Sequence, residues 1–159
     1  VVYTQLQNPY MDRMLNRARQ ALGCRLVERE GAGRQLIRCL QQGTSVGLIV
    51  DQRVDSGEPV PFFGRDMLTS ITPAQLALRF DCELIPVQIQ RLKGARFRAI
   101  IHDAVKPDDE TADRHTKVLQ ITTKINALFE SWIREQPQDW MCTKRRWPKH
   151  RQPSPTQAR

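Results

Sequence analysis

The sequence has no long run of apolar residues and few aromatic side chains. Its longest uninterrupted apolar stretch, with one glycine, is residues 46–50. A membrane-spanning helix needs ~20 such residues, so the sequence predicts none. Aromatic residues make up only 6% of the 159 positions, but hydrophobic residues make up 40% and charged residues 26%. This composition is that of a globular protein and excludes a disordered or collagen-like chain, and the length corresponds to one domain.

The sequence also lacks any Cys-x-x-Cys pair, and its cysteines do not cluster with its three histidines. This spacing indicates neither a zinc site nor a disulfide framework, and we expect no metal and no cofactor. We interpret the cysteines as buried or free thiols in a reducing compartment. They are Cys24, Cys39, Cys82 and Cys142.

Basic residues exceed acidic residues by 25 to 17, which gives a net charge of +8. The excess is segregated: residues 11–38 carry +4, residues 140–159 carry +6, and the stretch between them carries −2. A field of this kind attracts a polyanion, either nucleic acid, anionic lipid headgroups or an acidic protein. Charge alone does not choose among these three partners.

Helical and strand-like patterns alternate along the chain, which predicts an α/β fold with a mixed, largely parallel central sheet flanked by helices. The apolar, β-branched residues 44–50 are typical of a strand buried on both faces of such a sheet. The predicted helices are residues 10–22, 33–42, 72–80 and 118–132, and the predicted strands are 1–4, 24–28, 44–50, 84–89 and 96–101, the last two antiparallel. Glycines and prolines predict a loop over 51–65, and residues 150–159 are predicted to be a disordered basic tail.

Two pairs of adjacent residues in this pattern are candidates for a ligand-binding site. Asp51 and Gln52 follow the strongest predicted strand, and ligands of open α/β sheets lie beyond the carboxyl ends of strands. The alternative is that Asp51 only caps the next turn. Phe62 and Phe63 are adjacent rings within the predicted loop, and they either bury themselves or meet an apolar ligand.

The segment 140–147 places Lys144, Arg145 and Arg146 between Trp140 and Trp147. Arginine pairs with phosphate oxygens, while tryptophan favours the headgroup level of a bilayer or stacks on unpaired bases. The segment therefore suits an interface with phosphate. The alternative is a solvated basic face whose tryptophans belong to the core.

Four pieces of the chain together resemble the later half of the bacterial lipid A biosynthesis acyltransferases. They are Gly-Leu-Ile-Val-Asp-Gln at 47–52, Pro-Phe-Phe-Gly-Arg at 61–65, residues 69–78 with Pro73, and residues 137–147. They stand in the family's order, and the resemblance covers residues 1 to about 149. It implies a lauroyl or myristoyl type enzyme of the lysophospholipid acyltransferase superfamily, with a glycerolphosphate-acyltransferase-like fold. Residues 1–149 would then be the C-terminal part of a single acyltransferase domain, truncated at its N-terminus.

The resemblance implies transfer of a fatty acyl chain from acyl carrier protein thioester to a hydroxyl of a lipid A precursor, at the cytoplasmic face of the bacterial inner membrane. The implied partners are acyl carrier protein, a lipid A precursor or related phospholipid, and an anionic membrane surface, and nucleic acid is not among them. Asp51 and Gln52 would line the site. The remaining implied site residues are Phe62, Phe63, Gly64 and Arg65, around an acyl or acceptor cleft, and Lys144, Arg145 and Arg146, facing a phosphorylated headgroup or the carrier protein.

The sequence departs from the family pattern in its catalytic dyad. The family uses His-x-x-x-x-Asp/Glu, in which the histidine deprotonates the acceptor hydroxyl. Here His102, His115 and His150 are each followed five positions later by proline, glutamine or proline. We interpret the dyad as lying upstream of residue 1, and we expect these 159 residues alone to be inactive.

Two further positions differ from the family pattern. Thr4 stands where the family usually has arginine, and Arg53 stands where it commonly has Asp or Asn. The acceptor could therefore differ. Two alternatives stay open: an O-acyltransferase for a lysophospholipid or an amino-acid lipid, and a non-enzymatic basic module that binds anionic lipid or nucleic acid.

Overall fold

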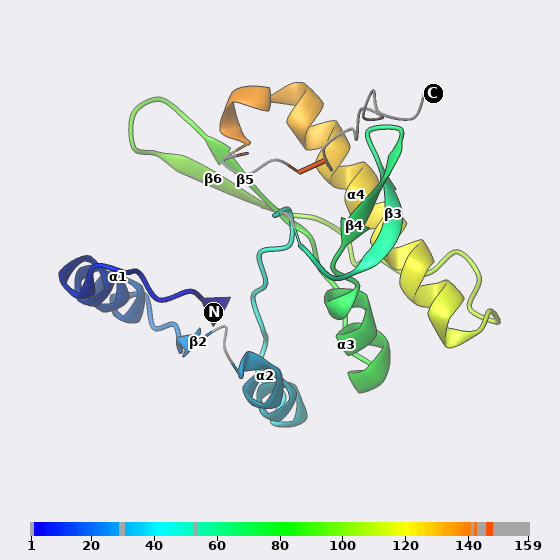
Figure 1. Cartoon of the computed structure of the whole chain (residues 1–159), viewed down its shortest axis with the longest axis horizontal. Coiled ribbons are helices and arrows are strands. Elements are labelled where there is room, and N and C mark those ends of the chain that lie inside the picture. Colours follow the sequence, from blue (N-terminus) through cyan, green and yellow to red (C-terminus); the bar gives the residue numbers. More distant parts are fainter. Residues whose placement is uncertain (1, 29–30, 53, 141, 143–145, 148–159) are drawn as a thin grey trace, which may run out of the picture.

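The computed structural model describes residues 2–28, 31–52, 54–140, 142 and 146–147. The predictions for Lys144, Arg145 and the tail 150–159 lie outside these described residues. The fold is mixed α/β, as predicted (Figure 1). In chain order its elements are β1 (Val2–Tyr3), α1 (Pro9–Ala21), β2 (Val27–Glu28), α2 (Ala32–Gln41), β3 (Glu58–Phe62), β4 (Arg65–Thr69), α3 (Thr72–Phe80), β5 (Val87–Arg91), β6 (Phe97–Ile101), α4 (Arg114–Glu135) and the 3₁₀ turn η1 (Pro137–Asp139).

The helices follow local signals in the sequence, and all four predicted helices are confirmed. The Asn8 side chain accepts hydrogen bonds from the Tyr10 and Met11 amides, and Pro9 occupies the first turn of α1. Asp113 caps α4 in the same way through the His115 and Thr116 amides. Such caps satisfy main-chain donors that have no partner inside the helix.

The strands form three separate two-stranded sheets. β1 and β2 are parallel, whereas β3–β4 and β5–β6 are antiparallel hairpins. The pairing of residues 84–89 with 96–101 is therefore confirmed in its direction, with β5 beginning three residues later than predicted. A largely parallel central sheet is not found among the described residues.

The predicted central strand, residues 44–50, is the main difference. It runs extended across the molecule but pairs with no other strand, and the main-chain groups of residues 45–50 make no hydrogen bond among the described residues. Ile49 is 71% exposed. A strand requires a neighbour at hydrogen-bonding distance, and a cleft separates this segment from β5.

The loop predicted over residues 51–65 is also partly wrong, because residues 58–69 form the β3–β4 hairpin. Phe63 and Gly64 are its two-residue turn, with φ of 51° and 71°, and positive φ at both positions is what tight hairpins require. Pro59 and Pro61 are tolerated because both strands of a two-stranded sheet are edges. Both prolines are exposed, while Val60 and Phe62, which alternate with them, are buried.

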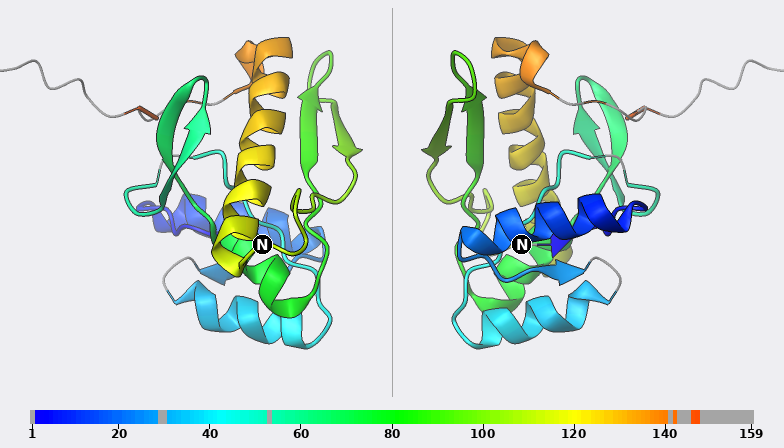
Figure 2. Two further views of the ribbon diagram at one scale, coloured as in Figure 1. Left: turned by 90° about the vertical axis from the view of Figure 1, so that its right-hand side faces the viewer. Right: turned by 90° about the vertical axis from the view of Figure 1, so that its left-hand side faces the viewer.

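Two small cores hold these elements together. Ala74 of α3 packs against Val118, Ile121 and Ile125 of α4. The second core contains Val27, Ala32 and Leu36, with Val2, Val46 and Leu48 packed against it. Figure 2 shows α4 running between the two hairpins, with α1 and α2 beneath them.

No disulfide joins the four cysteines: Cys39 is buried, Cys24 is half-buried, and Cys82 and Cys142 are exposed. Within the described ranges, no helix combines the length and the apolar character needed to cross a bilayer.

Candidate active site

Arg146 joins the candidate site segments. Its guanidinium Nη1 donates hydrogen bonds of 3.0 Å to two main-chain oxygens, those of Gln52 and Leu68. Its Nη2 lies 3.5 Å from the Thr69 hydroxyl. These bonds connect the end of the extended segment, strand β4 and the C-terminal basic segment. Residues far apart in the sequence therefore meet at one buried side chain.

Arg146 is only 4% exposed, so its charge is held inside the protein. Burial lowers the pKa of its guanidinium, and the negative charge of Asp51 opposes that shift. Its Nε atom finds no hydrogen-bond partner among the described residues. The carboxylate of Asp51 therefore stabilises the positive charge of the Arg146 guanidinium.

Four aromatic rings surround this junction. The Phe62 ring centroid lies 4.8 Å from that of Phe63, 6.1 Å from that of Trp140 and 6.0 Å from that of Trp147. The Arg146 guanidinium lies 5.5 Å from the Phe62 centroid. Phe62 is 1% exposed and is the centre of the cluster. The adjacent rings thus bury one another in part, which was one of the two outcomes expected for them.

Phe63 is held in an unfavourable backbone conformation. Its φ of 51° is uncommon for a bulky residue. Its amide donates a 2.6 Å hydrogen bond to the Glu130 carboxylate, and the Arg134 guanidinium lies 4.8 Å from its ring centroid. Helix α4 therefore fixes the turn of the hairpin. Residues in such conformations are often found at functional sites.

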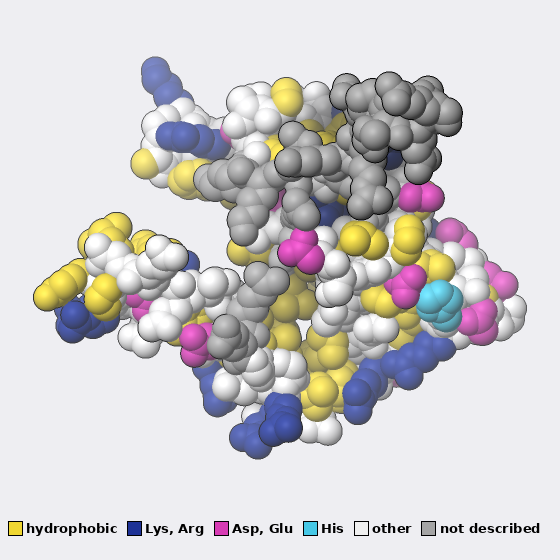
Figure 3. Space-filling view, viewed as in Figure 1, with side chains coloured by type: hydrophobic (Ala, Val, Ile, Leu, Met, Phe, Trp, Pro, Cys, Tyr) yellow, Lys and Arg dark blue, Asp and Glu magenta, His cyan; other side chains and the backbone are white. Residues whose placement is uncertain are grey.

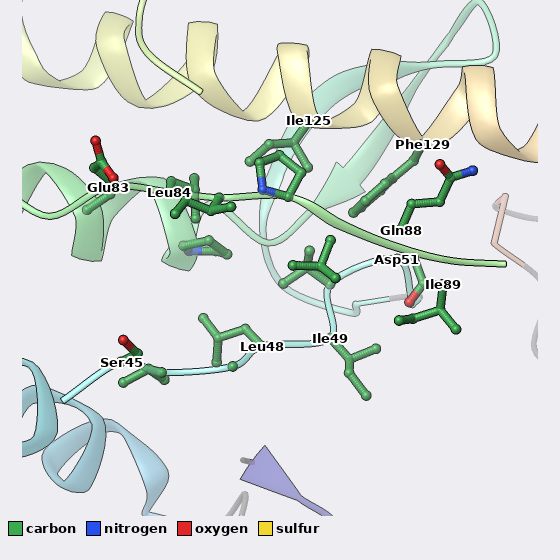
Figure 4. Close-up of a pocket in the computed structure, with 18 of the residues that line it drawn as sticks. Ser45, Leu48, Ile49, Asp51, Glu83, Leu84, Gln88, Ile89, Ile125 and Phe129 are labelled. Carbon is green, nitrogen blue, oxygen red and sulfur yellow. The ribbon is translucent and has the colours of Figure 1, made fainter. Parts of the chain in front are cut away.

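An apolar cleft of about 900 Å³ opens beside the junction. Its walls are the extended residues 43–51 and the segment 82–89, and Ile125 and Phe129 of α4 reach down into it (Figure 4). Asp51 stands at one end, and Trp140 also lines the cleft. No histidine is found among the described residues of its lining.

The structure places the predicted site residues in three groups. Asp51 is half-buried and lines the cleft, whereas Gln52 is exposed and uses its main-chain oxygen to bind Arg146. The second group is the hairpin, with Phe62 buried, Phe63 half-buried, and Gly64 and Arg65 exposed. The third is Arg146, which contacts protein carbonyls instead of facing solvent.

Sequence reasoning missed two residues of α4. Asn126 is buried, and its side-chain nitrogen donates to the Pro61 main-chain oxygen at 2.9 Å and to the Thr69 hydroxyl at 3.4 Å. Glu130 accepts from Phe63. The signal was available, because Asn126 follows the apolar Ile125 and Glu130 lies four residues further on, so both share the buried side of the helix.

The family model for bacterial lipid A biosynthesis acyltransferases matches residues 1–149. The chain belongs to this family. The match spans the extended segment, the β3–β4 hairpin and the segment 140–147, and it confirms the resemblance carried by those motifs. Membership assigns the chain to acyltransferases of lipid A and lipopolysaccharide biosynthesis, a class of bacterial enzymes that act on lipids. No curated protein matches the chain.

Proposed function

We propose that this chain is part of an enzyme that transfers a lauroyl or myristoyl type chain from acyl carrier protein thioester to a hydroxyl of a lipid A precursor. One observation carries the proposal: Arg146 brings three motif-bearing segments together at the end of an apolar cleft. An apolar cleft with a few polar groups at one end suits a ligand with a long hydrocarbon chain and a reactive polar end.

Each site residue has a distinct role in this proposal. Asp51 orients the acceptor hydroxyl at the end of the cleft, and Gln52 offers an exposed amide beside it. Phe62 supports the hairpin from within, because it is buried among the other rings. Phe63 and Gly64 form the hairpin turn beside the aromatic cluster and are not part of the cleft lining, and Arg65 is exposed next to them.

A general base is required to remove the proton from the acceptor hydroxyl. Because no described residue lining the cleft is a histidine, we assign this role to a His-x-x-x-x-Asp/Glu dyad upstream of residue 1. Residues 1–149 are then the C-terminal part of one acyltransferase domain. The longer polypeptide that contains both parts is called the parent protein below.

The basic surface suits anionic partners. Exposed arginines occur on α1 and α2, and Figure 3 shows basic side chains along its lower edge, over α2. Acyl carrier protein, a phosphorylated lipid A precursor and the cytoplasmic face of the inner membrane are all negatively charged partners for such a surface. Lys144 and Arg145 would face the same partners.

The test is an acylation assay of the parent protein with acyl carrier protein thioester and separate acceptors. We expect product with a lipid A precursor and little with a lysophospholipid or an amino-acid lipid. We expect none with the 159 residues alone, because general-base catalysis contributes ~10²–10⁴-fold. Preferred acylation of another acceptor contradicts the proposed acceptor, and turnover by the 159-residue chain contradicts the role of the dyad.

A further inference from the structure

Helix α1 turns its apolar side outward. Apolar residues recur along it every three or four positions, which places them on one side of the helix, and in most surface helices that side packs on the core. Here all of them except the half-buried Leu15 are exposed, Tyr10 by 76%, Met14 by 55% and the C-cap Leu22 by 79%. The exposed set, called the apolar stripe below, is Tyr10, Met11, Met14, Ala18, Ala21 and Leu22.

The polar side of α1 binds the rest of the protein instead. Asp12 is 7% exposed, and its carboxylate accepts hydrogen bonds from the Leu6 amide at 3.0 Å and from the Asn16 side chain at 2.9 Å. The Arg19 guanidinium donates to the Asn16 side chain at 3.0 Å and lies 5.7 Å from the ring centroid of Tyr3 in β1. These contacts fix the rotation of the helix about its own axis, so the apolar stripe is directed away from the protein.

The place of α1 in the molecule makes the apolar stripe accessible. Figure 1 shows α1 at the left edge, apart from the hairpins and α4. In the right-hand view of Figure 2 it lies in front of them. In Figure 3 hydrophobic side chains gather at the outer end of α1, beside basic ones. A contiguous apolar surface with a polar rim marks a contact with another protein or with a membrane.

The charges of α1 distinguish between these two contacts. Its only acidic residue, Asp12, is buried, whereas Arg13 and Arg17 are exposed. Arg13 follows Tyr10 by three positions and Arg17 follows Met14 by three, so both arginines border the apolar stripe. The Arg13 guanidinium lies 5.0 Å from the Tyr10 ring centroid. A bilayer with anionic lipids offers hydrocarbon and negative phosphate in adjacent layers, which matches an apolar stripe with an arginine border.

The side chains of the apolar stripe and its border also suit lipid. Tyrosine is enriched where a bilayer meets water, and methionine is flexible enough to adapt to a surface without fixed shape. Arginine lays its alkyl stem along apolar surface while its guanidinium reaches phosphate. We propose that α1 lies in the membrane–water interface, with its apolar stripe among the lipids and Arg13 and Arg17 at the phosphates. This rests on the proposed function insofar as that function places the enzyme at a membrane.

The connection between α1 and the cleft gives this contact a functional consequence. Arg19 of α1 contacts Tyr3, and the preceding residue, Val2, packs against the same core as Val46 and Leu48 of the cleft wall. A helix seated in the interface therefore holds the cleft beside the membrane, where a lipid acceptor resides.

Photo-crosslinking of the parent protein to vesicles of phosphatidylethanolamine and phosphatidylglycerol tests the proposal without a measurement of activity. Tyr10→p-benzoylphenylalanine places a photoreactive ring in the apolar stripe. His115→p-benzoylphenylalanine is the matched control: both residues are exposed, aromatic and second in their helices, and both donate their amides to an N-cap side chain. In Figure 1 the start of α4 lies across the molecule from α1. We expect at least about tenfold more lipid adduct at residue 10 than at residue 115.

Three outcomes overturn the proposal. One is an equal amount of lipid adduct at the two positions. Another is an adduct of residue 10 with protein instead of lipid, which would show that another part of the polypeptide or a second copy covers the apolar stripe. The third is loss of the lipid adduct at ~1 M salt, because charge attraction is then screened and only the insertion of apolar side chains remains.

A pair of variants makes the test specific to the apolar stripe. Met14→Glu, made in the protein with the photoreactive ring at residue 10, should reduce the lipid adduct about tenfold, because it places a negative charge among the lipids. Gln20→Glu makes a similar change at an exposed position of α1 outside the apolar stripe, and it should reduce the adduct less than about twofold. Equal effects overturn the proposal. A parent protein that forms the lipid adduct but transfers no acyl chain contradicts the proposed function alone, and an active enzyme without the adduct contradicts this inference alone.

Discussion

The guanidinium of Arg146 donates a 3.0 Å hydrogen bond to the main-chain oxygen of Gln52, 94 positions earlier in the sequence. The same nitrogen donates to Leu68 at 3.0 Å. Arg146, a charged residue of the C-terminal basic run 144–146, is therefore buried and binds the candidate site. This relationship gives Arg146 a structural contribution to the fold.

Replacing Arg146 should destabilise the protein. Arg146→Met removes the donor for the main-chain oxygens of Gln52 and Leu68, in two part-buried hydrogen bonds, and each hydrogen bond to a charged group contributes about 1.5–3 kcal/mol. We expect the free energy of unfolding to fall by about 3 kcal/mol, and Arg146→Lys to recover part of it by keeping the charge. Denaturant titration of the parent protein measures both. Arg98→Met, at an exposed arginine of β6, should change stability by less than about 0.5 kcal/mol, and a comparable loss there would show that Arg146 is not special.

Asp51→Asn should lower activity more than stability. Asp51 is half-buried, and its charge acts on Arg146 without an ion pair between the two among the described residues. A partly exposed charge interaction contributes no more than about 0–1 kcal/mol to stability. We expect kcat/KM of the parent protein to fall at least about tenfold, which corresponds to about 1.4 kcal/mol in the transition state. Thermal unfolding and steady-state kinetics on the same sample separate the two effects. A large loss of Tm with normal turnover of the remaining folded enzyme would support a capping role only.

The two adjacent phenylalanines should differ in what they contribute. Phe62→Ala empties the centre of the aromatic cluster and should cost about 3–5 kcal/mol of stability. Phe63→Ala removes a half-buried ring and should cost about 1–2 kcal/mol, but it should raise KM for the acyl donor or the acceptor. Unfolding curves and KM values for both variants check this. Identical stability losses, with KM unchanged in both, would contradict the assignment.

Lys144 and Arg145 should contribute to binding anionic lipid. Each charge near an anionic surface contributes about 1 kcal/mol, so Lys144→Gln with Arg145→Gln should weaken binding about thirtyfold. The measurement is co-sedimentation of the parent protein with anionic and with neutral vesicles. The matched control is Lys93→Gln with Arg98→Gln, two exposed basic residues at the β5–β6 hairpin.

Single-stranded DNA is included in that experiment at the same salt concentration, because phosphate contacts are salt-dependent. We expect weak binding to DNA. Tight DNA binding with no response to anionic lipid would favour the nucleic-acid module instead.

The N-cap of α4 should make stability depend on acidic pH. The hydroxyl of Thr116, the largest contributor, and its amide lower the pKa of Asp113 below its ordinary value of 3.8. A carboxyl with a lowered pKa in the folded state stabilises the protein above its unfolded pKa, and this contribution is lost as pH falls through the folded value. Asp113→Asn keeps a capping oxygen but does not titrate. Its loss of stability between about pH 5 and about pH 2 should be smaller than that of the unaltered protein. An equal loss would show that this carboxyl does not contribute.

The helices were predictable from the sequence because their determinants are local. Asn8 with Pro9, and the apolar spacing of α4, act over a few residues, and the structure follows them closely. The strands were not equally predictable, because a strand exists only when a partner lies beside it. Residues 44–50 have the composition of a buried strand but no neighbour among the described residues. In β3, the prolines at 59 and 61 concealed a strand that survives because both strands of its hairpin are edges.

The site was predictable as a set of motifs but not as an arrangement. The resemblance placed Asp51, Phe63 and Arg146 in one functional region, and the structure shows that Arg146 joins the segments that carry the other two. Nothing in the basic run 144–146 predicts that Arg146 is buried. Its burial arises with the carbonyl groups of Gln52 and Leu68, which only the folded chain brings within reach.

The unpaired segment at residues 45–50 has a consequence for how such a protein survives in the cell. An apolar, strand-like segment without a partner is a template for pairing with another chain. Natural proteins usually cover such a segment with another element or place charged side chains on it. Here no charged residue stands between Ser45 and Val50, and no strand pairs with them in the described part of the chain. We expect a polypeptide with this segment uncovered to aggregate or to be held by chaperones.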